Sequence, residues 1–531
     1  MDWPVSQGTE EEDSLLHPPS GVADPDYNED ARPERAPHGQ HVSWTSAYML
    51  MMSRMVGAGV FATPGVVART AGSPDMALLV WAIGAGIAAC QVVIALEFGC
   101  MLPRSGGDKV YLEYVYRRPR WLMSTIIAVR AVVMMTTANN SIIFGEYLMH
   151  ALSSNSSDAA RRSAALFLLT GSAVLHGLFL RPGIYVQNAL GWCKIATLLF
   201  MIVIAVGTVL IRSSPPPSPP ADPTVVAGGV WEGSSWEWET VSLALFKVQY
   251  AYAGIENANN VLDEVVNPVR MLKCVMPLAI LSVCLLYTLL NMAFFLVMPL
   301  QEIQDSGEMA AAAFFDRLFG VQAGGILISI LIAISVAGNV MVGIFSVSRL
   351  NQEIARQGFL PRCFASSKPW NAPLGGVMVN FVPSALLILF LPSRDIYSFV
   401  LSAEGYTRQL VDISLAAGLL WLRRARPHMA RPFRAWIPLI WFRLALCVAM
   451  VAAPFVPASG TGDGRAPWAE HGIYALVGLA IIATATLYWF VWAKLLPYLW
   501  GHRLEEREGM FTDGTSYKEI VRVSGRCDVT E

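Results

Sequence analysis

Charged residues are scarce in this chain. Asp, Glu, Lys and Arg make up 15% of its 531 residues, and hydrophobic residues make up 54%. Soluble domains carry about 25% charged residues. A chain this apolar would aggregate in water, so its solvent is lipid. The net charge of -2 indicates no particular partner, and the lack of a long basic run gives no sign of nucleic-acid binding.

The first residues of the sequence do not have the pattern of a signal peptide. Residues 1–42 are polar, acidic and proline-rich, without the basic start and apolar core of a secretory signal. We predict that residues 1–42 form a disordered cytoplasmic tail. The polar residues 501–531 are predicted to form a second, C-terminal cytoplasmic tail.

Paired cysteines and nucleotide-binding loops are missing as well. The eight cysteines show no paired spacing, so we predict no disulfide and no metal site. No Gly-x-x-x-x-Gly-Lys-Ser/Thr loop occurs, which argues against an ATP-driven pump. No His or Cys constellation suggests a membrane-embedded acyltransferase or a similar enzyme. We therefore expect neither an enzyme nor a cofactor.

Long apolar runs are what the chain does have. A helix needs roughly 20 apolar residues to cross the hydrocarbon core of a bilayer. Runs of this kind predict an all-α polytopic protein with about twelve spans. The predicted spans are residues 43–68, 76–101, 121–149, 163–180, 186–211, 241–264, 275–300, 323–357, 374–391, 397–422, 437–456 and 473–498.

Basic residues set the predicted orientation. Most Lys and Arg of the short loops fall on one side of the membrane, which the positive-inside rule assigns to the cytoplasm. The opposite side holds only Arg69, Arg161, Arg162, Arg212, Arg317, Arg394 and Arg465. Both termini are therefore expected in the cytoplasm, with the plasma membrane as the expected location. The sequon at Asn155 then faces outward, and whether it is glycosylated stays open.

Two predicted spans contain residues that disrupt helices. Residues 43–68 hold Gly57-Ala58-Gly59 near their middle, and residues 241–264 hold Gly254 followed by Glu256 and three Asn. Each Gly weakens a helix interior by about 1 kcal/mol relative to Ala. A Glu that faced lipid would cost more. We therefore predict that both spans are broken.

The two breaks occupy corresponding places when each half of the chain is counted as five spans. Such a pair points to the binding site of inverted-repeat transporters. Freed N–H groups attract a carboxylate and freed carbonyls accept from an ammonium, so the site suits a zwitterion. The alternative is that these glycines only permit close helix packing.

Several motifs occur in a specific order along the chain. They are Arg54 to Pro64, Glu97-Phe98-Gly99 with Pro103 to Glu113, Tyr252-Ala253-Gly254 with Asn259 and Asn267-Pro268, Ser335 to Asn339, and Arg431-Pro432-Phe433-Arg434. This order resembles the amino acid–polyamine–organocation superfamily, and within it the L-type amino acid transporters and the fungal high-affinity methionine permeases. The resemblance covers about residues 43–434.

The resemblance implies the leucine-transporter fold, with inverted repeats at about residues 43–211 and 241–422 and extra helices at about 437–498. It implies alternating access around a central site, with Tyr250 as an aromatic gate. Backbone N–H groups of segment one would hold a carboxylate, and carbonyls of segment six an ammonium. The candidate substrate-binding residues are Gly57, Ala58, Gly59, Val60, Tyr250, Ala251, Tyr252, Ala253, Gly254 and Glu256.

Two residues depart from the family pattern. Ala58 stands where relatives usually have Ser or Thr, so the carboxylate grip should rest on main-chain donors. Glu256 stands where L-type transporters have Asn. It could attract a cationic substrate, bind a coupling proton, or cap a half-helix, and all three interpretations stay open.

Ionisable residues inside spans are functional candidates. Lys194 matches a family lysine that takes the place of a sodium ion, which implies sodium-independent transport. Its ammonium is expected to join carbonyls of segments one and eight, near Ser335. A desolvated Lys can lose its proton, so proton coupling is one interpretation and a permanent structural charge is the other.

Other intramembrane charges receive simpler interpretations. Glu404, Arg408 and Asp412 recur every four residues and share one helix face, so pairing among them explains them better than a gate. Arg54 lies one turn towards the cytoplasm from Gly57. Its pairing with Asp263 or Glu264 is the candidate inner gate.

The resemblance leads us to expect secondary transport of amino acids, with neutral L-amino acids and methionine as the first candidates. A nutrient receptor with a transporter fold, and a carrier of cationic amino acids or polyamines, are the alternatives. No Cys lies between His150 and Arg162, so no disulfide-linked heavy chain is expected. A small-molecule amino acid, the lipid bilayer and a coupling proton are the expected partners.

Overall fold

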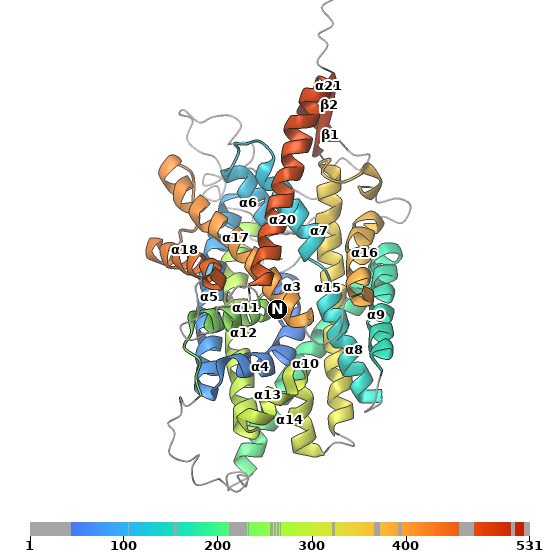
Figure 1. The fold of residues 1–531 in the computed structure, drawn as a ribbon, viewed down its shortest axis with the longest axis vertical. Helices are drawn as coiled ribbons and strands as arrows, with labels where there is room; N and C mark the ends of the chain where they lie inside the picture. The colour runs from blue at the N-terminus through green and yellow to red at the C-terminus, as the bar shows by residue number, and fades with distance from the viewer. Residues whose placement is uncertain are drawn as a thin grey trace, which may run out of the picture.

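The computed structural model describes most of the chain from residue 44 onward. The described residues are 44–104, 106–152, 157–211, 231, 233–254, 259, 262, 265, 267–320, 324–365, 372–390, 396–455, 472–510 and 516–524. Within these ranges the chain is almost entirely helical (Figure 1).

The first half of the chain supplies helices that run back and forth across the molecule. They are α3 (Trp44–Met55), α4 (Ala58–Ala71), α5 (Pro74–Met101), α6 (Asp108–Val115), α7 (Leu122–Met134), α8 (Ala138–Leu152), α9 (Asp158–Leu178) and α10 (Leu180–Ile211).

The second half supplies a similar set and a C-terminal strand pair. Its elements are α11 (Trp238–Ala251), α12 (Pro268–Val297), α13 (Leu300–Ser306), α14 (Ala310–Phe319), α15 (Gly324–Arg356), α16 (Leu374–Phe390), α17 (Ile396–Ala425), α18 (Ile437–Ala452), α20 (Ile473–Phe490), α21 (Leu496–Trp500), β1 (His502–Met510) and β2 (Ser516–Ser524).

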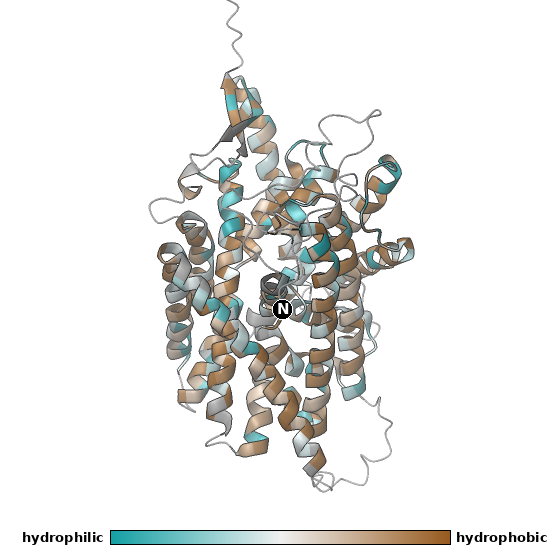
Figure 2. Cartoon of the chain, turned by 180° about the vertical axis from the view of Figure 1, so that it is seen from behind, coloured by the Kyte–Doolittle hydropathy of each residue, from teal (hydrophilic) through white to brown (hydrophobic). Residues whose placement is uncertain are grey.

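The helices have the length and composition of membrane spans. In the described residues, eight helical segments are long and apolar enough to cross a bilayer, and α16 is a shorter apolar helix. Large apolar side chains such as Phe167, Val203 and Phe390 are more than half exposed at the rim, which suits a lipid solvent. Apolar residues predominate along the long helices (Figure 2). The protein is therefore a predominantly helical polytopic membrane protein, as predicted.

Segments one and six are both interrupted. Helix α3 ends at Met55 and α4 begins at Ala58, so the break falls at Val56 and Gly57. Helix α11 ends at Ala251 and is followed by a turn through Gly254, whose φ of 115° lies in the left-handed region. Glycine adopts this backbone conformation without the steric cost that other residues carry. The predicted breaks are present at these positions.

The third span is also broken: the predicted span over residues 121–149 matches the candidate span Leu122–Leu152, but its helix is interrupted near the middle. Helix α7 ends at Met134 and α8 begins at Ala138. Side chains of α16 satisfy the freed backbone, because Asn380 donates to the Met135 carbonyl at 2.8 Å and Ser384 accepts from the Thr137 amide at 3.1 Å. A neighbouring helix thus supplies the hydrogen bonds that lipid cannot.

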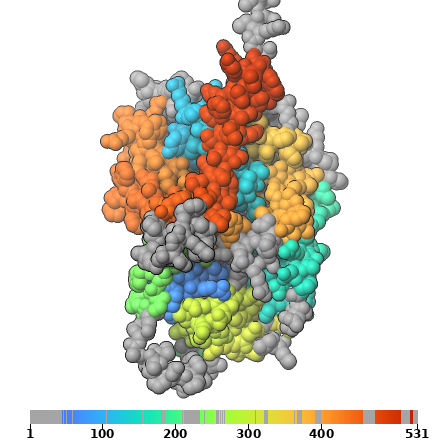
Figure 3. Space-filling view, viewed as in Figure 1, coloured from blue at the N-terminus to red at the C-terminus, as the bar shows by residue number. Residues whose placement is uncertain are grey.

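The C-terminal region is an ordered hairpin where the sequence predicted only a polar tail. Strands β1 and β2 pair antiparallel from His502↔Ser524 to Met510↔Ser516. Glu506 accepts from the Trp121 indole at 2.6 Å, and the Ile520 amide donates to the Gln357 carbonyl at 3.3 Å. The hairpin therefore rests on the ends of the third and eighth spans, and it projects beyond the helices (Figure 3).

Candidate functional site

The start of α4 and the end of α11 meet in the middle of the molecule. A Cβ added to Gly59 would lie 2.7 Å from the Ala251 Cα, so only glycine allows this approach. Gly57 caps α4 without any side-chain hydrogen bond to the first turn. The amides of that turn carry the positive end of the helix dipole, and the last carbonyls of α11 carry the negative end of theirs. The partly positive amides of α4 and the partly negative carbonyls of α11 therefore lie close to each other at the two helix breaks.

The predicted site residues are distributed as follows. Val60, Ala251, Tyr252 and Gly254 are buried around the two breaks, Gly57 is buried beside them, and Ala253 is exposed. The backbone of Ala58 begins α4. Glu256, Asp263 and Glu264 lie outside the described residues, so the proposed roles of these three carboxylates stay predictions.

The Tyr287 side chain of α12 joins both breaks. Its hydroxyl lies 2.6 Å from the Met55 carbonyl, which ends α3, and 3.0 Å from the Ala251 carbonyl, which ends α11. A hydroxyl has one proton, so only one of these carbonyls can receive a full hydrogen bond at a time. The other carbonyl keeps accepting capacity for a cation such as an ammonium.

Asparagine side chains line the opposite side of the breaks. The Tyr250 hydroxyl donates to Asn140 Oδ1 at 3.2 Å, and Asn339 Nδ2 donates to the same oxygen at 3.3 Å. Asn339 also packs directly against the Cα of Gly57, where an added Cβ would collide with its amide. These contacts tie the first, third, sixth and eighth spans together around the site.

Lys194 is fully buried in α10 and holds the end of α3. Its ammonium donates to the Ser53 carbonyl at 2.6 Å and to Ser53 Oγ at 3.3 Å. The expected bond to a carbonyl of segment eight is not among its contacts in the described residues. Instead, the Lys194 stem lies against Gly338 of α15, where an added Cβ would be 2.8 Å from Cε. The lysine therefore bonds to segment one and only packs against segment eight.

The remaining candidates occupy separate positions. The Ser335 hydroxyl is buried and has no hydrogen-bond partner within the described residues, so nothing there links it to Lys194. Arg54 points its guanidinium towards α15, where a Cβ on Gly343 would lie 3.2 Å from Nη1. Among the described residues no acid contacts Lys194, and its ammonium donates only to oxygen atoms of Ser53 in α3.

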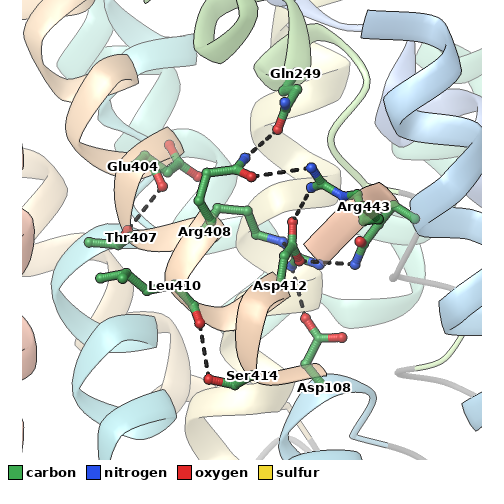
Figure 4. A network of polar contacts seen from close by, with 11 residues as sticks. Asp108, Gln249, Glu404, Thr407, Arg408, Leu410, Asp412, Ser414 and Arg443 are labelled. Atoms are coloured by element: carbon green, nitrogen blue, oxygen red, sulfur yellow. Dashed lines mark hydrogen bonds and ion pairs between the residues drawn. The ribbon is translucent and has the colours of Figure 1, made fainter. Parts of the chain in front are cut away.

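Arg408 and Asp412 pair with each other, as their spacing predicted, at 2.9 Å. They belong to a larger network that includes Asp108 of α6, Gln249 of α11 and Arg443 of α18 (Figure 4). Glu404 shares the same helix, and its carbonyl accepts from Thr407 at 2.9 Å.

Sequence reasoning missed Tyr287, Asn140, Asn339 and Arg443 as neighbours of the site. Asn140 and Arg443 carried a usable signal, because each is a polar residue inside an apolar run. Tyr287 carried none, since tyrosine is common in membrane helices and its hydroxyl finds its partners only after the helices pack.

Comparisons with known proteins agree with this arrangement. A family model described as amino acid permease matches residues 42–488. The high-affinity methionine permease of Saccharomyces cerevisiae is 30% identical over 497 residues, which cover 89% of this chain and 83% of that protein. The low-affinity methionine permease of the same yeast is 29% identical over 505 residues, covering 94% and 91%.

Proteins of lower sequence identity also match most of the chain. The human cystine/glutamate transporter is 27% identical over 408 residues, which cover 76% of this chain and 78% of that protein. Among solved structures, a manganese transporter mutant from Eremococcus coleocola superposes with a TM-score of 0.53 at 12% identity. It covers 87% of this chain and 98% of its own, so the likeness supports the fold alone.

Proposed function

The chain belongs to the amino acid permease family, and we propose that it carries neutral L-amino acids, with methionine as the leading candidate. That it transports amino acids across a membrane follows from the family and from relatives that are permeases and transporters. The choice of methionine is supported by two yeast relatives that match most of the chain.

The observation that carries the proposal is the meeting of two half-helix ends at Gly59 and Ala251. In this proposal the amides of the first turn of α4 hold the substrate carboxylate. The carbonyls that end α3 and α11 hold its ammonium, sharing it with Tyr287. Tyr250 closes over the substrate through its bond to Asn140. Opening either side in turn gives alternating access.

Coupling to protons rather than sodium is the second part of the proposal. The Lys194 ammonium sits where a cation can bind the end of α3, at 2.6 Å from the Ser53 carbonyl. A lysine that loses its proton would release that carbonyl and free α3 to move. Glu256 is the other candidate for the coupling proton, and Arg54 with Asp263 or Glu264 is the candidate inner gate.

The protein is multi-pass, and we place it in the plasma membrane with both termini in the cytoplasm. The hairpin and the basic ends of the helices, such as Arg423 and Arg424, then face inward. We also propose that the protein works without a disulfide-linked heavy chain, because the segment from His150 to Arg162 has no cysteine.

Transport assays in proteoliposomes test the proposal. We expect saturable uptake of methionine and other neutral amino acids, independent of sodium and increased by an inward proton gradient. Lys194→Met or Glu256→Gln should remove the increase caused by the gradient. Lysine or polyamine uptake above that of neutral amino acids would assign the site to cationic substrates. Binding without flux would support a receptor.

Lys247→Met is the matched control for Lys194→Met. Lys247 is also buried in a membrane helix, but its ammonium donates to the Thr70 hydroxyl at 3.2 Å and not to a backbone carbonyl at a break. Its removal should leave the effect of the proton gradient in place. If Lys194→Met and Glu256→Gln both keep that effect, neither residue couples protons to transport.

A further inference from the structure

A buried network of polar side chains connects α18, the eleventh span, to the C-terminal end of α11, which lies at the candidate site (Figure 4). Its centre is Asp412 of α17, which is 2% exposed. The carboxylate accepts from Arg443 at 2.6 Å, from Arg408 at 2.9 Å and from Gln91 at 2.9 Å. Three donors, two of them cationic, fix the position of the Asp412 carboxylate.

Arg443 continues the network on its other side. Its Nη1 donates to Gln409 Oε1 at 3.2 Å, and Gln409 Nε2 donates to Gln249 Oε1. A guanidinium can only donate, so Arg443 requires the amide oxygen of Gln409 to face it. The amide nitrogen of Gln409 must then face Gln249. The Arg443 guanidinium thereby sets the direction of both hydrogen bonds, from Arg443 to Gln409 and from Gln409 to Gln249.

Gln249 is in the last turn of α11, directly before Tyr250. Its own Nε2 points to the sulfur of Met450, in the last turn of α18, at 3.5 Å. At its other end α11 meets α18 again, where Trp238 donates to the Ala449 carbonyl at 3.0 Å. Helix α18 therefore contacts α11 near both ends of α11.

We propose that Gln409, oriented by Arg443, is a positioning residue that sets the last turn of α11 for substrate binding. Span eleven lies outside the predicted repeats, and this network makes it part of the transport machinery. The inference rests on the proposed role of Tyr250 and Ala251 in the substrate site. Breaking the relay lets the last turn of α11 shift, which weakens substrate binding without removing any group that touches the substrate.

Uptake kinetics of conservative variants test the relay. Gln409→Met and Gln249→Met keep side-chain size and remove the bond, and each should raise KM for methionine roughly 2- to 12-fold, the effect of one neutral hydrogen bond. The double variant should raise KM no more than the larger single change, because both remove the same contact. Additive effects would contradict the relay.

Gln409→Glu separates the direction of the bond from its presence. The carboxylate still accepts from Arg443 but has no proton to donate to Gln249. KM should rise as it does in Gln409→Met, even though the arginine contact is kept. A KM equal to that of the wild type in Gln409→Glu would overturn the claim that the donated proton positions α11.

Gln91→Met is the matched control, because Gln91 donates to the same carboxylate and makes no hydrogen bond to α11 in the described residues. A role limited to stability would lower the melting temperature in all three Met variants and leave KM unchanged, which overturns the inference. A raised KM in Gln409→Met and Gln249→Met with an unchanged KM in Gln91→Met supports it. No uptake by the wild type would instead overturn the proposed function.

Discussion

Lys194 and Asp412 are both fully or almost fully buried charges inside the helical core, but they are balanced in different ways. The Lys194 ammonium donates only to oxygen atoms of Ser53 in the described residues. Asp412 meets the guanidinium groups of Arg408 and Arg443. One site has a single charge held by dipoles, and the other has opposite charges that neutralise one another.

This difference separates a charge held in ion pairs from a charge held by dipoles alone. Removing the Asp412 carboxylate would leave Arg443 buried without its counter-ion, while Arg408 would keep its contact with Asp108. A lysine held by a carbonyl and a hydroxyl leaves no buried counter-ion behind when it loses its proton. The network is thus suited to fixing helices, and Lys194 is suited to releasing one.

Asp412→Asn should produce the largest loss of stability. It removes the only carboxylate that contacts Arg443 in the described residues, and breaking a buried ion pair costs about 3–5 kcal/mol. We expect little folded protein by size-exclusion chromatography in detergent and a strongly lowered melting temperature. Adding Arg443→Met should recover part of the loss, because no unpaired cation then remains on span eleven. An unchanged melting temperature in Asp412→Asn would remove the contrast with Lys194.

Lys194→Met should cost less stability than Asp412→Asn, because it leaves no buried charge unpaired. The lost bonds from a charged donor to Ser53 correspond to about 1.5–3 kcal/mol. Uptake should fall far more than the amount of folded protein does. Equal melting temperatures for Lys194→Met and Asp412→Asn would show that the two charges are structural in the same sense.

Tyr287→Phe should produce the smallest loss of stability of the three changes. It removes one hydroxyl shared by Met55 and Ala251, at about 0.5–1.5 kcal/mol for a neutral hydrogen bond. The folded protein should be recovered in normal yield while KM rises. A lowered yield with an unchanged KM would assign Tyr287 to packing rather than to the site.

The helix breaks show how far the sequence alone could be used. Gly57 and Gly59 predict the break in segment one, and Gly254 with the polar residues after it predicts the break in segment six. The third span contains Met134-Met135-Thr136-Thr137 at its break, without Gly or Pro. That break exists because Asn380 and Ser384 of α16 satisfy the freed backbone. A local sequence cannot reveal hydrogen bonds supplied by a helix more than 240 residues away.

The C-terminal hairpin shows the same limit. Residues 502–510 and 516–524 are polar, which is typical of a tail. Two strands alone also make only a marginally stable hairpin in water, so the sequence gives little reason to expect one. The hairpin is supported by the ends of spans three and eight. Its Glu506 accepts from Trp121, and its Ile520 donates to the Gln357 carbonyl and packs against a small apolar cluster there.

Composition and the spacing of apolar runs determined by themselves that this protein crosses a membrane many times, since an apolar chain has no other stable solvent. The two glycine-marked breaks predicted where the candidate site lies, because backbone freed within a membrane is expected to line a cavity. The tertiary structure alone decided which side chains meet that backbone. Tyr287, Asn140, Lys194 and Gln409 acquire their partners from distant helices, and only packing brings a donor to a particular carbonyl.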